Sequence, residues 1–220
     1  RDQMLIIKSK NIDCKKFFRK GDVIVLSFEE KNNSYQLSQI PKVNGGMVVI
    51  ENNTGRVLAM VGGYDSSSSF NRSTQAKRQL GSSFKPIVYL TALENGYTPI
   101  SKVLDAPFVV DDYSDKGVWR PTNYGDKFYG LSTLRLGIEK SRNLMTVRLS
   151  DQLGLDKISK VSLKLGIYEK FPNLISSSLG SLESTLQKIT AAYATIANRG
   201  YKVESKLIDV IYDSNGEVLY

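Results

Sequence analysis

Residues 81–86 read Gly-Ser-Ser-Phe-Lys-Pro and place Ser82 three positions before Lys85. Side chains at positions i and i+3 lie on one face of a helix, so this serine and this lysine can meet there. Pro86 is tolerated only near the start of a helix, because it lacks a backbone donor. We therefore predict a helix over residues 82–95, with Ser82 at its N-terminal end.

The composition narrows what a nucleophilic serine could use as its base. The 220 residues include no histidine, which excludes Ser-His-Asp triads, Cys-His pairs and histidine-ligated metals. The single cysteine, Cys14, excludes an intramolecular disulfide and cysteine-rich metal centres. The base must then be Lys, Asp, Glu or Tyr, and a lysine is the natural partner of a serine. We expect neither a metal nor a cofactor.

The chain is basic, with 30 Lys and Arg against 22 Asp and Glu and a net charge of +8. These cations are scattered, and the densest cluster lies at residues 15–20. Because no nucleic-acid recognition motif accompanies them, we expect no nucleic-acid partner. A basic nucleic-acid-binding domain is the alternative, which a steep salt dependence of DNA affinity would reveal. No apolar run approaches the ~20 residues that span a bilayer.

Hydrophobic spacing outlines the rest of the fold. Strands followed by helices and then by strands predict an α+β fold. We expect strands at 23–28, 35–40, 47–50 and 56–61, helices at 132–153 with a break near Ser141, 155–165 and 185–198, and a final hairpin of 207–212 with 218–220.

Three local patterns add detail. The hairpin over residues 47–61 is almost continuously apolar, which favours strands covered on both faces. Ser184 to Gln187 form a capping-box pattern that would start the last helix. Residues 97–130 are rich in aromatic side chains and read as irregular.

Taken alone, the Ser82–Lys85 pattern is weak evidence for a catalytic pair. A serine that caps a helix and a surface lysine one turn later give the same sequence pattern. Its context gives it weight: a glycine before it, a proline after it, an apolar helix behind it and a hairpin upstream. A lysine is a poor base at its ordinary pKa of ~10.4. Burial and nearby cations, here Lys77 and Arg78, would lower the pKa of Lys85.

With its neighbours, this stretch resembles the active-site serine motif of class A penicillin-binding proteins of the 1A type. Further segments are similar to the transpeptidase domain of that family, in the same order along the chain. They are Gly45 to Tyr64, Arg72, Gln75 and Arg78 before the serine, Trp119 to Tyr124, Ser181 to Glu183 and Ala191 to Ala194.

The resemblance implies an α+β fold of the penicillin-binding and serine β-lactamase type, with an antiparallel sheet packed against helices beside a helical subdomain. Residues 1–44 are then part of a β-rich, OB-like linker domain. Residues 45–220 are then a D,D-transpeptidase domain, truncated before the family's K-[ST]-G strand.

The resemblance also implies roles for four residues. Ser82 corresponds to the nucleophile that attacks the D-Ala-D-Ala carbonyl to form an acyl-enzyme, and Lys85 corresponds to its general base. In the second motif, S-x-N, Ser141 is expected to relay the proton to the leaving group and Asn143 to hydrogen-bond the substrate amide. Ser141 is also expected to cap the helix that starts at Asn143.

Two other stretches, residues 9–11 and 69–71, also match the S-x-N pattern. Both precede the nucleophile, and we interpret them as unrelated to the active site. The family's third motif, K-[ST]-G, does not occur in the sequence, which we interpret as truncation. In the family its strand supplies one oxyanion-hole N–H, and losing such a donor costs ~10²–10³ in rate. We therefore expect this chain to be inactive or strongly impaired, with an unpaired sheet edge.

The expected function is peptidoglycan D,D-transpeptidation, with stem peptides as donor and amine acceptor and with β-lactams as covalent inhibitors. The expected location is the bacterial cell envelope, at the periplasmic face of the inner membrane, with membrane contact through an upstream segment. Two alternatives are a serine β-lactamase or β-lactam sensor, and a non-catalytic module that binds peptidoglycan.

Overall fold

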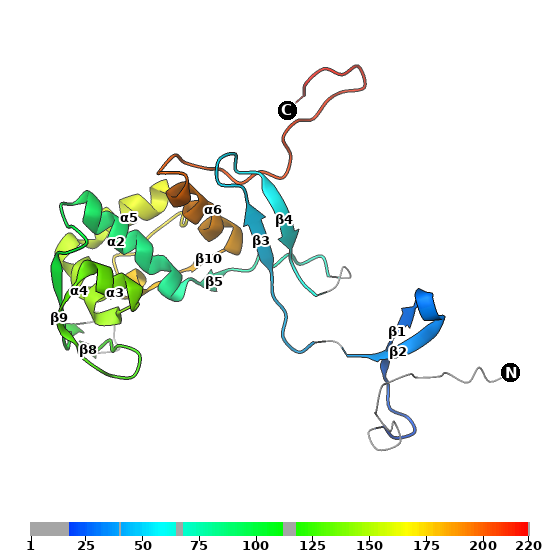
Figure 1. Cartoon of the computed structure of the whole chain (residues 1–220), viewed down its shortest axis with the longest axis horizontal. Helices are drawn as coiled ribbons and strands as arrows, with labels where there is room; N and C mark the ends of the chain where they lie inside the picture. The colour runs from blue at the N-terminus through cyan, green and yellow to red at the C-terminus, as the bar shows by residue number, and fades with distance from the viewer. Residues whose placement is uncertain (1–17, 40, 65–67, 112–117, 220) are drawn as a thin grey trace. The chain divides into compact units, whose positions relative to one another are not determined.

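The computed structural model describes residues 18–39, 41–64, 68–111 and 118–219. It divides into two compact units, one before Gly45 and one from Gly45 onward (Figure 1). None of the helices in these ranges has the length and apolar character that crossing a bilayer requires.

The first unit contains an antiparallel hairpin. Strand β1 (Val25–Glu29) and strand β2 (Ser34–Ser38) are joined by the 3-10 turn η1 (Glu30–Asn32). The rings of Phe28 and Tyr35 face each other across it, with centroids 5.1 Å apart. Both strands were predicted, and their ends differ from the predicted ones by one or two residues.

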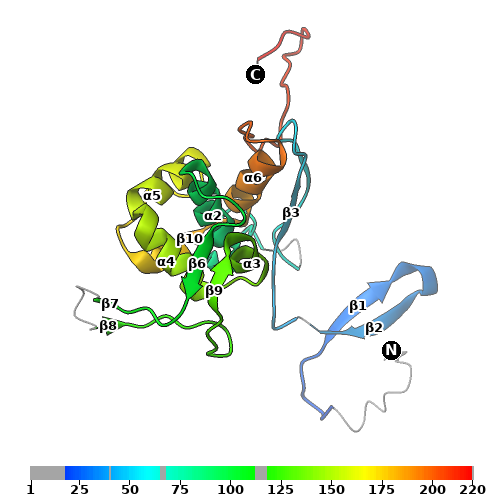
Figure 2. The ribbon, with the colours of Figure 1, turned by 60° about the vertical axis from the view of Figure 1, so that its left-hand side comes forward.

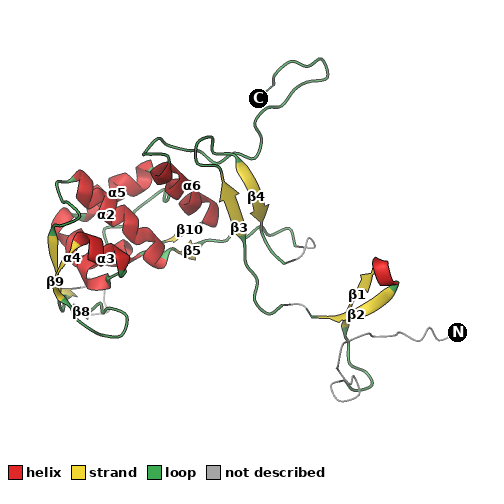
Figure 3. Ribbon diagram, viewed as in Figure 1, coloured by secondary structure: helices red, strands yellow, loops and turns green. Residues whose placement is uncertain are grey.

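The second unit contains five α-helices and two 3-10 helices within its described residues (Figure 3). Their positions confirm the predicted helices and the predicted break near Ser141. The elements are η2 (Gly81–Phe84), α2 (Lys85–Glu94), α3 (Leu134–Glu139), α4 (Asn143–Leu153), α5 (Leu155–Lys164), η3 (Ile175–Leu179) and α6 (Leu186–Ala197).

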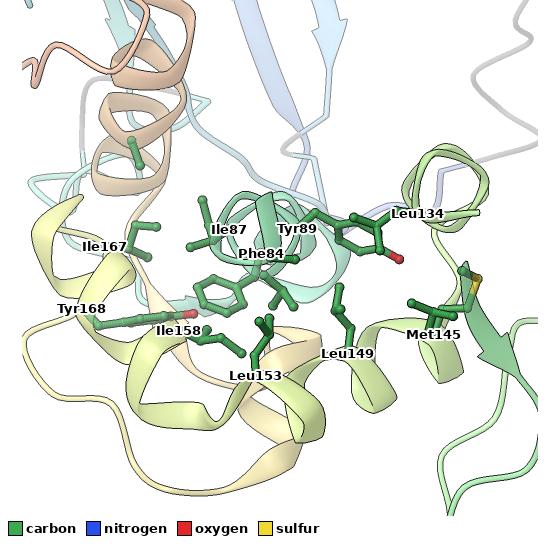
Figure 4. Close-up of a cluster of buried hydrophobic side chains, with 14 of the residues drawn as sticks. Phe84, Ile87, Tyr89, Leu134, Met145, Leu149, Leu153, Ile158, Ile167 and Tyr168 are labelled. Atoms are coloured by element: carbon green, nitrogen blue, oxygen red, sulfur yellow. The ribbon is translucent and has the colours of Figure 1, made fainter. Parts of the chain in front are cut away.

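The core is built around α2, with α4 and α5 packed against it (Figure 4). Phe84, at the start of α2, is fully buried, and its ring lies 5.5 Å from that of Tyr168 and 5.9 Å from that of Phe171. This aromatic contact fixes the residue directly before Lys85. Ile87, Val88 and Ala92 continue the buried face of α2.

The strands of the second unit form antiparallel pairs. The pairs are β3 (Met47–Ile50) with β4 (Val57–Val61), β5 (Arg78–Gln79) with β10 (Glu183–Ser184), β6 (Lys102–Asp105) with β9 (Gly130–Thr133), and β7 (Val110–Asp111) with β8 (Val118–Trp119). The last two pairs correct the interpretation of residues 97–130 as irregular. These strands are only two to four residues long, too short for alternation to reveal, and β6 and β9 also pair across a long sequence separation.

The β3–β4 hairpin was predicted, but its expected burial on both faces is wrong. Figure 2 shows β3 beside α6, and Val48, Ile50 and Val57 belong to the same apolar cluster as Ala194 of α6. The residues that alternate with them, with Met47 54% and Val61 48% exposed, have no such cover in the described structure. The hairpin is therefore covered on one face only, although its sequence is apolar on both faces.

Two further predictions need correction. Helix α6 is capped by Thr185, which accepts from Lys188 N, whereas Ser184 Oγ donates to the backbone oxygen of Ile167. The cap thus lies one residue later than the capping-box pattern placed it. In the final hairpin, the turn forms, but a single bridge between Tyr212 and Val218 replaces the predicted strands within the described residues.

Candidate active site

Ser82 lies exposed in η2, at the N-terminal end of α2, as predicted. Backbone bonds hold this turn against residues that come a hundred positions later: Gly81 N donates to Gly180 O over 2.9 Å, and Leu80 N donates to Leu182 O. Gly180 has φ +76°, and a Cβ there would collide with the backbone of Gly81. The turn that presents Ser82 therefore rests on a glycine-to-glycine contact.

A second element supports the same turn from α6. The hydroxyl of Tyr193 donates to the backbone oxygen of Ser83 over 2.8 Å. Ser83 Oγ in turn donates to the backbone oxygen of Leu80 over 2.6 Å. The Ser83 hydroxyl is thus bonded within the turn, whereas no hydrogen bond of the Ser82 hydroxyl is found in the described structure, and Ser82 is exposed.

Lys85 is buried, with 2% of its surface exposed, and its Nζ lies among three acceptors. It donates to the backbone oxygen of Ser141 over 2.6 Å, to Ser141 Oγ over 2.9 Å and to Asn143 Oδ1 over 2.6 Å. The structure therefore brings together three of the four residues that the sequence analysis singled out. An ammonium has three N–H donors, and each has an acceptor here.

Burial lowers the pKa of Lys85 from 10.5 to about 8. Taking an ammonium out of water disfavours its charged form. At pH 7, about a tenth of such a lysine is a neutral amine, as its pKa dictates. The expected help from Lys77 and Arg78 is not found, because burial is the cause of the shift.

Ser141 occupies the break between α3 and α4, where its φ of +51° places it in the left-handed region. Its hydroxyl accepts from Lys85 and does not cap α4, so the expected N-cap role is wrong. The cap comes instead from Asn123, whose Oδ1 accepts from the backbone N–H groups of Asn143 and Leu144.

In the described structure, no hydrogen bond joins Ser82 Oγ to Lys85 Nζ. The lysine instead donates to both residues of the second motif. A neutral amine has two N–H donors and one lone pair, so deprotonation frees Lys85 from one of its three acceptors. The lone pair can then accept a proton from a hydroxyl that approaches from the Ser82 turn.

Of the two competing S-x-N stretches, the one at residues 69–71 does not join this site. Residues 9–11 lie outside the described residues. Asn71 N donates to Gln75 Oε1, and its side chain lies against Gly62, in the loop after β4. The described ranges also contain no group of three or more Cys, Asp or Glu side chains placed to hold a metal ion.

Several residues around the site had no role in the sequence analysis. Thr122 O accepts from Asn143 Nδ2 over 2.8 Å, and Asn123 caps α4. Both belong to the Trp-Arg-Pro-Thr-Asn-Tyr stretch that carried part of the resemblance, and that was the one signal that pointed to them. Tyr193 likewise lies within Ala191 to Ala194, a stretch for which no function was predicted.

Comparison with known proteins identifies the family of the chain. The family model of the penicillin binding protein transpeptidase domain matches residues 45–219, and the chain belongs to this family. Penicillin-binding protein 1A of Rickettsia conorii is 48% identical over 219 residues, which cover 99% of this chain and 28% of that protein. The chain thus spans less than a third of the length of this relative.

Two solved structures are similar to the chain. The crystal structure of penicillin-binding protein 1A from Haemophilus influenzae gives a TM-score of 0.78 at 32% identity and covers 90% of this chain and 30% of that one. PonA1 of Mycobacterium tuberculosis in complex with penicillin V gives 0.71 at 25% identity and covers 82% of this chain and 50% of that one. The predicted penicillin-binding fold is therefore confirmed.

Proposed function

We propose that this chain carries the acyl-transfer site of a peptidoglycan D,D-transpeptidase, in which Ser82 is the nucleophile. The observation that supports it best is Lys85: a buried amine with a lowered pKa, three residues after an exposed serine and bonded to both members of an S-x-N motif. In this chain without histidine, a lysine three residues after the serine is the base that we favour.

In the first half-reaction, Ser82 Oγ forms a bond to the carbonyl carbon of the penultimate D-Ala, and its proton passes to neutral Lys85. The C–N bond to the terminal D-Ala then breaks. The leaving amine receives a proton through Ser141, whose hydroxyl lies 2.9 Å from Lys85 Nζ. The products are an ester on Ser82 and free D-alanine.

In the second half-reaction, an amine of a neighbouring stem peptide attacks the carbonyl carbon of that ester, and the new amide bond forms as the C–O bond to Ser82 breaks. The amine loses a proton to the Lys85–Ser141 pair, and Ser82 regains its own. Asn143 is the residue that we assign to the substrate amide, with its Nδ2 as the donor. One of its two N–H donors bonds to Thr122 O, which leaves the second donor for the substrate. The N-terminal end of the η2–α2 segment favours the negative charge that develops beside Ser82.

The same site accounts for β-lactams as inhibitors. A β-lactam presents a strained amide to Ser82 and remains attached as an acyl-enzyme when the ring opens. Membership of the penicillin-binding family and the likeness to a protein solved with penicillin V support this reading. It places the protein in the bacterial cell envelope, at the periplasmic face of the inner membrane, where peptidoglycan is assembled.

Two other expectations belong to this proposal. The unit before Gly45 is part of a β-rich, OB-like linker, which its β1–β2 hairpin suits. The 220 residues alone acylate slowly or not at all, because their sequence has no K-[ST]-G motif to supply the second oxyanion donor. The β-lactamase and binding-module alternatives have no comparable support.

The experiment is the intact mass of the natural gene product that carries residues 1–220, after incubation with a penicillin. We expect one adduct on the wild type, no adduct on Ser82→Ala, and a retained adduct on Ser83→Ala, the matched control one position away. An adduct that persists on Ser82→Ala, or a wild type without any, refutes the proposal. Rapid loss of the adduct with release of penicilloate would favour a β-lactamase.

A further inference from the structure

A buried polar pair lies behind the site, at the point where α4 begins. Asp105, the last residue of β6, has no exposed surface, and Asn123 has 3%. Asn123 Nδ2 donates to Asp105 Oδ1 over 2.6 Å and to the backbone oxygen of Lys127 over 2.9 Å. A charged group is rarely buried without a role that holds it there, since taking it out of water is costly.

The other end of the Asn123 amide reaches α4. Its Oδ1 accepts from Asn143 N over 2.9 Å and from Leu144 N over 3.2 Å. All four hydrogen-bonding positions of this amide are therefore occupied, which allows it a single orientation. Residue Arg142, which precedes α4, makes no side-chain cap of its own. The first turn of α4 thus depends on a side chain from twenty residues earlier.

Arg142 completes the arrangement around the carboxylate. Its Nε lies 3.9 Å from Asp105 Oδ2, and its guanidinium stacks on the ring of Tyr129, with Cζ 3.2 Å from the ring centroid. Asp105 Oδ2 is buried and has no hydrogen-bond partner in the described structure, so the carboxylate is oriented chiefly through Oδ1 and Asn123. Its charge polarises the amide and strengthens Oδ1 as an acceptor at the helix N-terminus.

The consequence reaches Lys85 through Asn143. Thr122 O, adjacent to Asn123 in the chain, holds Asn143 Nδ2, while Asn123 Oδ1 holds Asn143 N. With both of these groups fixed, Asn143 Oδ1 points to Lys85 Nζ at 2.6 Å. An amide held at one end only could rotate and offer its NH₂ group to the lysine instead.

We propose that Asp105 and Asn123 are positioning residues for the acyl transfer, which act by capping α4 and thereby directing the amide of Asn143. The inference rests on the proposed function. Neither residue touches the reacting atoms. Their effect is exerted on the S-x-N motif, and through it on the base.

The test is the second-order rate of acylation by a penicillin, measured on the natural gene product. Asn123→Asp keeps an acceptor for the N-terminus of α4 but places a new carboxylate against that of Asp105. We expect the acylation rate to fall at least about tenfold. In Asp105→Asn/Asn123→Asp, the new amide donates to the new carboxylate, so the bond returns with reversed polarity. We expect this double variant to recover most of the lost rate. If it is no faster than Asn123→Asp, the proposal is overturned.

A control separates positioning from mere stability. Leu153→Ala opens a cavity at the far end of α4, so it lowers the melting temperature but leaves the acylation rate of the folded protein within about twofold. If it slows acylation as much as Asn123→Asp does, Asn123 is merely structural. A milder variant, Asp105→Asn, serves if Asn123→Asp does not fold. It removes the charge but keeps an acceptor, and wild-type acylation in Asp105→Asn refutes the role of that charge.

The pH profile gives a second readout. Without Asn143 Oδ1 in place, the Lys85 ammonium loses an acceptor, so its pKa falls further and the acidic limb of the acylation rate moves to lower pH. The groups that remain bonded to Lys85, both from Ser141, are uncharged, and burial rather than the charge of Asp105 or Arg142 is the cause of its lowered pKa. Asn123→Asp also adds a carboxylate, which by itself would raise this pKa, so the limb is measured on Asn123→Ala, which removes the cap without adding a charge. An unmoved limb in Asn123→Ala contradicts the inference. A wild type that forms no adduct refutes instead the proposed function beneath it.

Discussion

Lys85 Nζ donates to Asn143 Oδ1 over 2.6 Å, and this bond joins the first turn of α2 to the first turn of α4. The nitrogen that we propose as the base is therefore also a packing contact between two helices. Its protonation state affects the chemistry and the stability of the site at the same time.

The first prediction concerns the pH dependence of acylation. If neutral Lys85 takes the proton of Ser82, the rate with a penicillin rises through pH 7 and levels off above its pKa of about 8. Stopped-flow or mass measurements between pH 6 and 9.5 check this. A rate that stays flat across this range argues against Lys85 as the base.

The same residue predicts a trend in stability. The pKa of Lys85 is about 8 in the folded chain and 10.5 as the ordinary value, so between these values the unfolded state holds the additional proton. Its contribution to stability is therefore smallest below pH 8 and grows as the pH rises towards 10.5. Denaturant unfolding of wild type and Lys85→Met checks this, because the variant should lose that part of the pH slope.

Asn143→Asp is predicted to move the acidic limb of the acylation rate to higher pH. A carboxylate in place of the amide oxygen next to Lys85 favours the ammonium, so the pKa of Lys85 rises and less of it is neutral at pH 7. We expect slower acylation at pH 7 and a limb displaced upward by about one unit or more. Asn143→Ala is the control, since it removes the acceptor without adding charge and cannot raise the limb in this way.

Gly180→Ala is predicted to damage the site through the backbone. The new Cβ meets Gly81 directly, so the turn that carries Ser82 has to shift. Gly166→Ala is a matched control: its φ is also positive, +71°, but nothing lies within 4 Å of the added atom. We expect the control to lose roughly 1–2 kcal/mol and to keep its acylation rate. Gly180→Ala should lose more stability and most of the rate, and equal effects would contradict the contact.

Phe84→Ala tests the aromatic support under Lys85. The side chain is fully buried between Tyr168 and Phe171, so we expect a loss of about 3–5 kcal/mol in the free energy of unfolding. Phe70→Ala, at a position that is 45% exposed, should cost far less. Urea unfolding of both variants gives the comparison, and a small loss for Phe84→Ala would mean that the cluster does not hold this turn.

Much of the fold could be predicted because its signals are local. Pro86 near the start of α2 fixed where Ser82 lies, and apolar spacing located α5 and α6 within a residue or two. The break before α4 was visible in the same way. The grouping of Lys85 with the S-x-N motif came from the resemblance, since periodicity does not tell which helix termini meet.

What the sequence analysis missed depends on contacts between distant residues. Asn123 caps a helix that begins twenty residues later, and Tyr193 supports a turn more than a hundred residues earlier. Neither bond leaves a pattern in the sequence near the group that it serves. The expected cap by Ser141 failed for the same reason, because a lysine from another helix takes up its hydroxyl.

The one-sided cover of the β3–β4 hairpin has a consequence for the behaviour of this polypeptide in solution. In the described structure β3 pairs with β4 alone, and Met47, Val49, Leu58 and Val61 are more than two fifths exposed. A free strand edge beside an uncovered apolar face is a template for another chain. Concentrated samples of the 220 residues on their own will therefore self-associate through this hairpin, and handling them will require dilution or a detergent before any kinetic work.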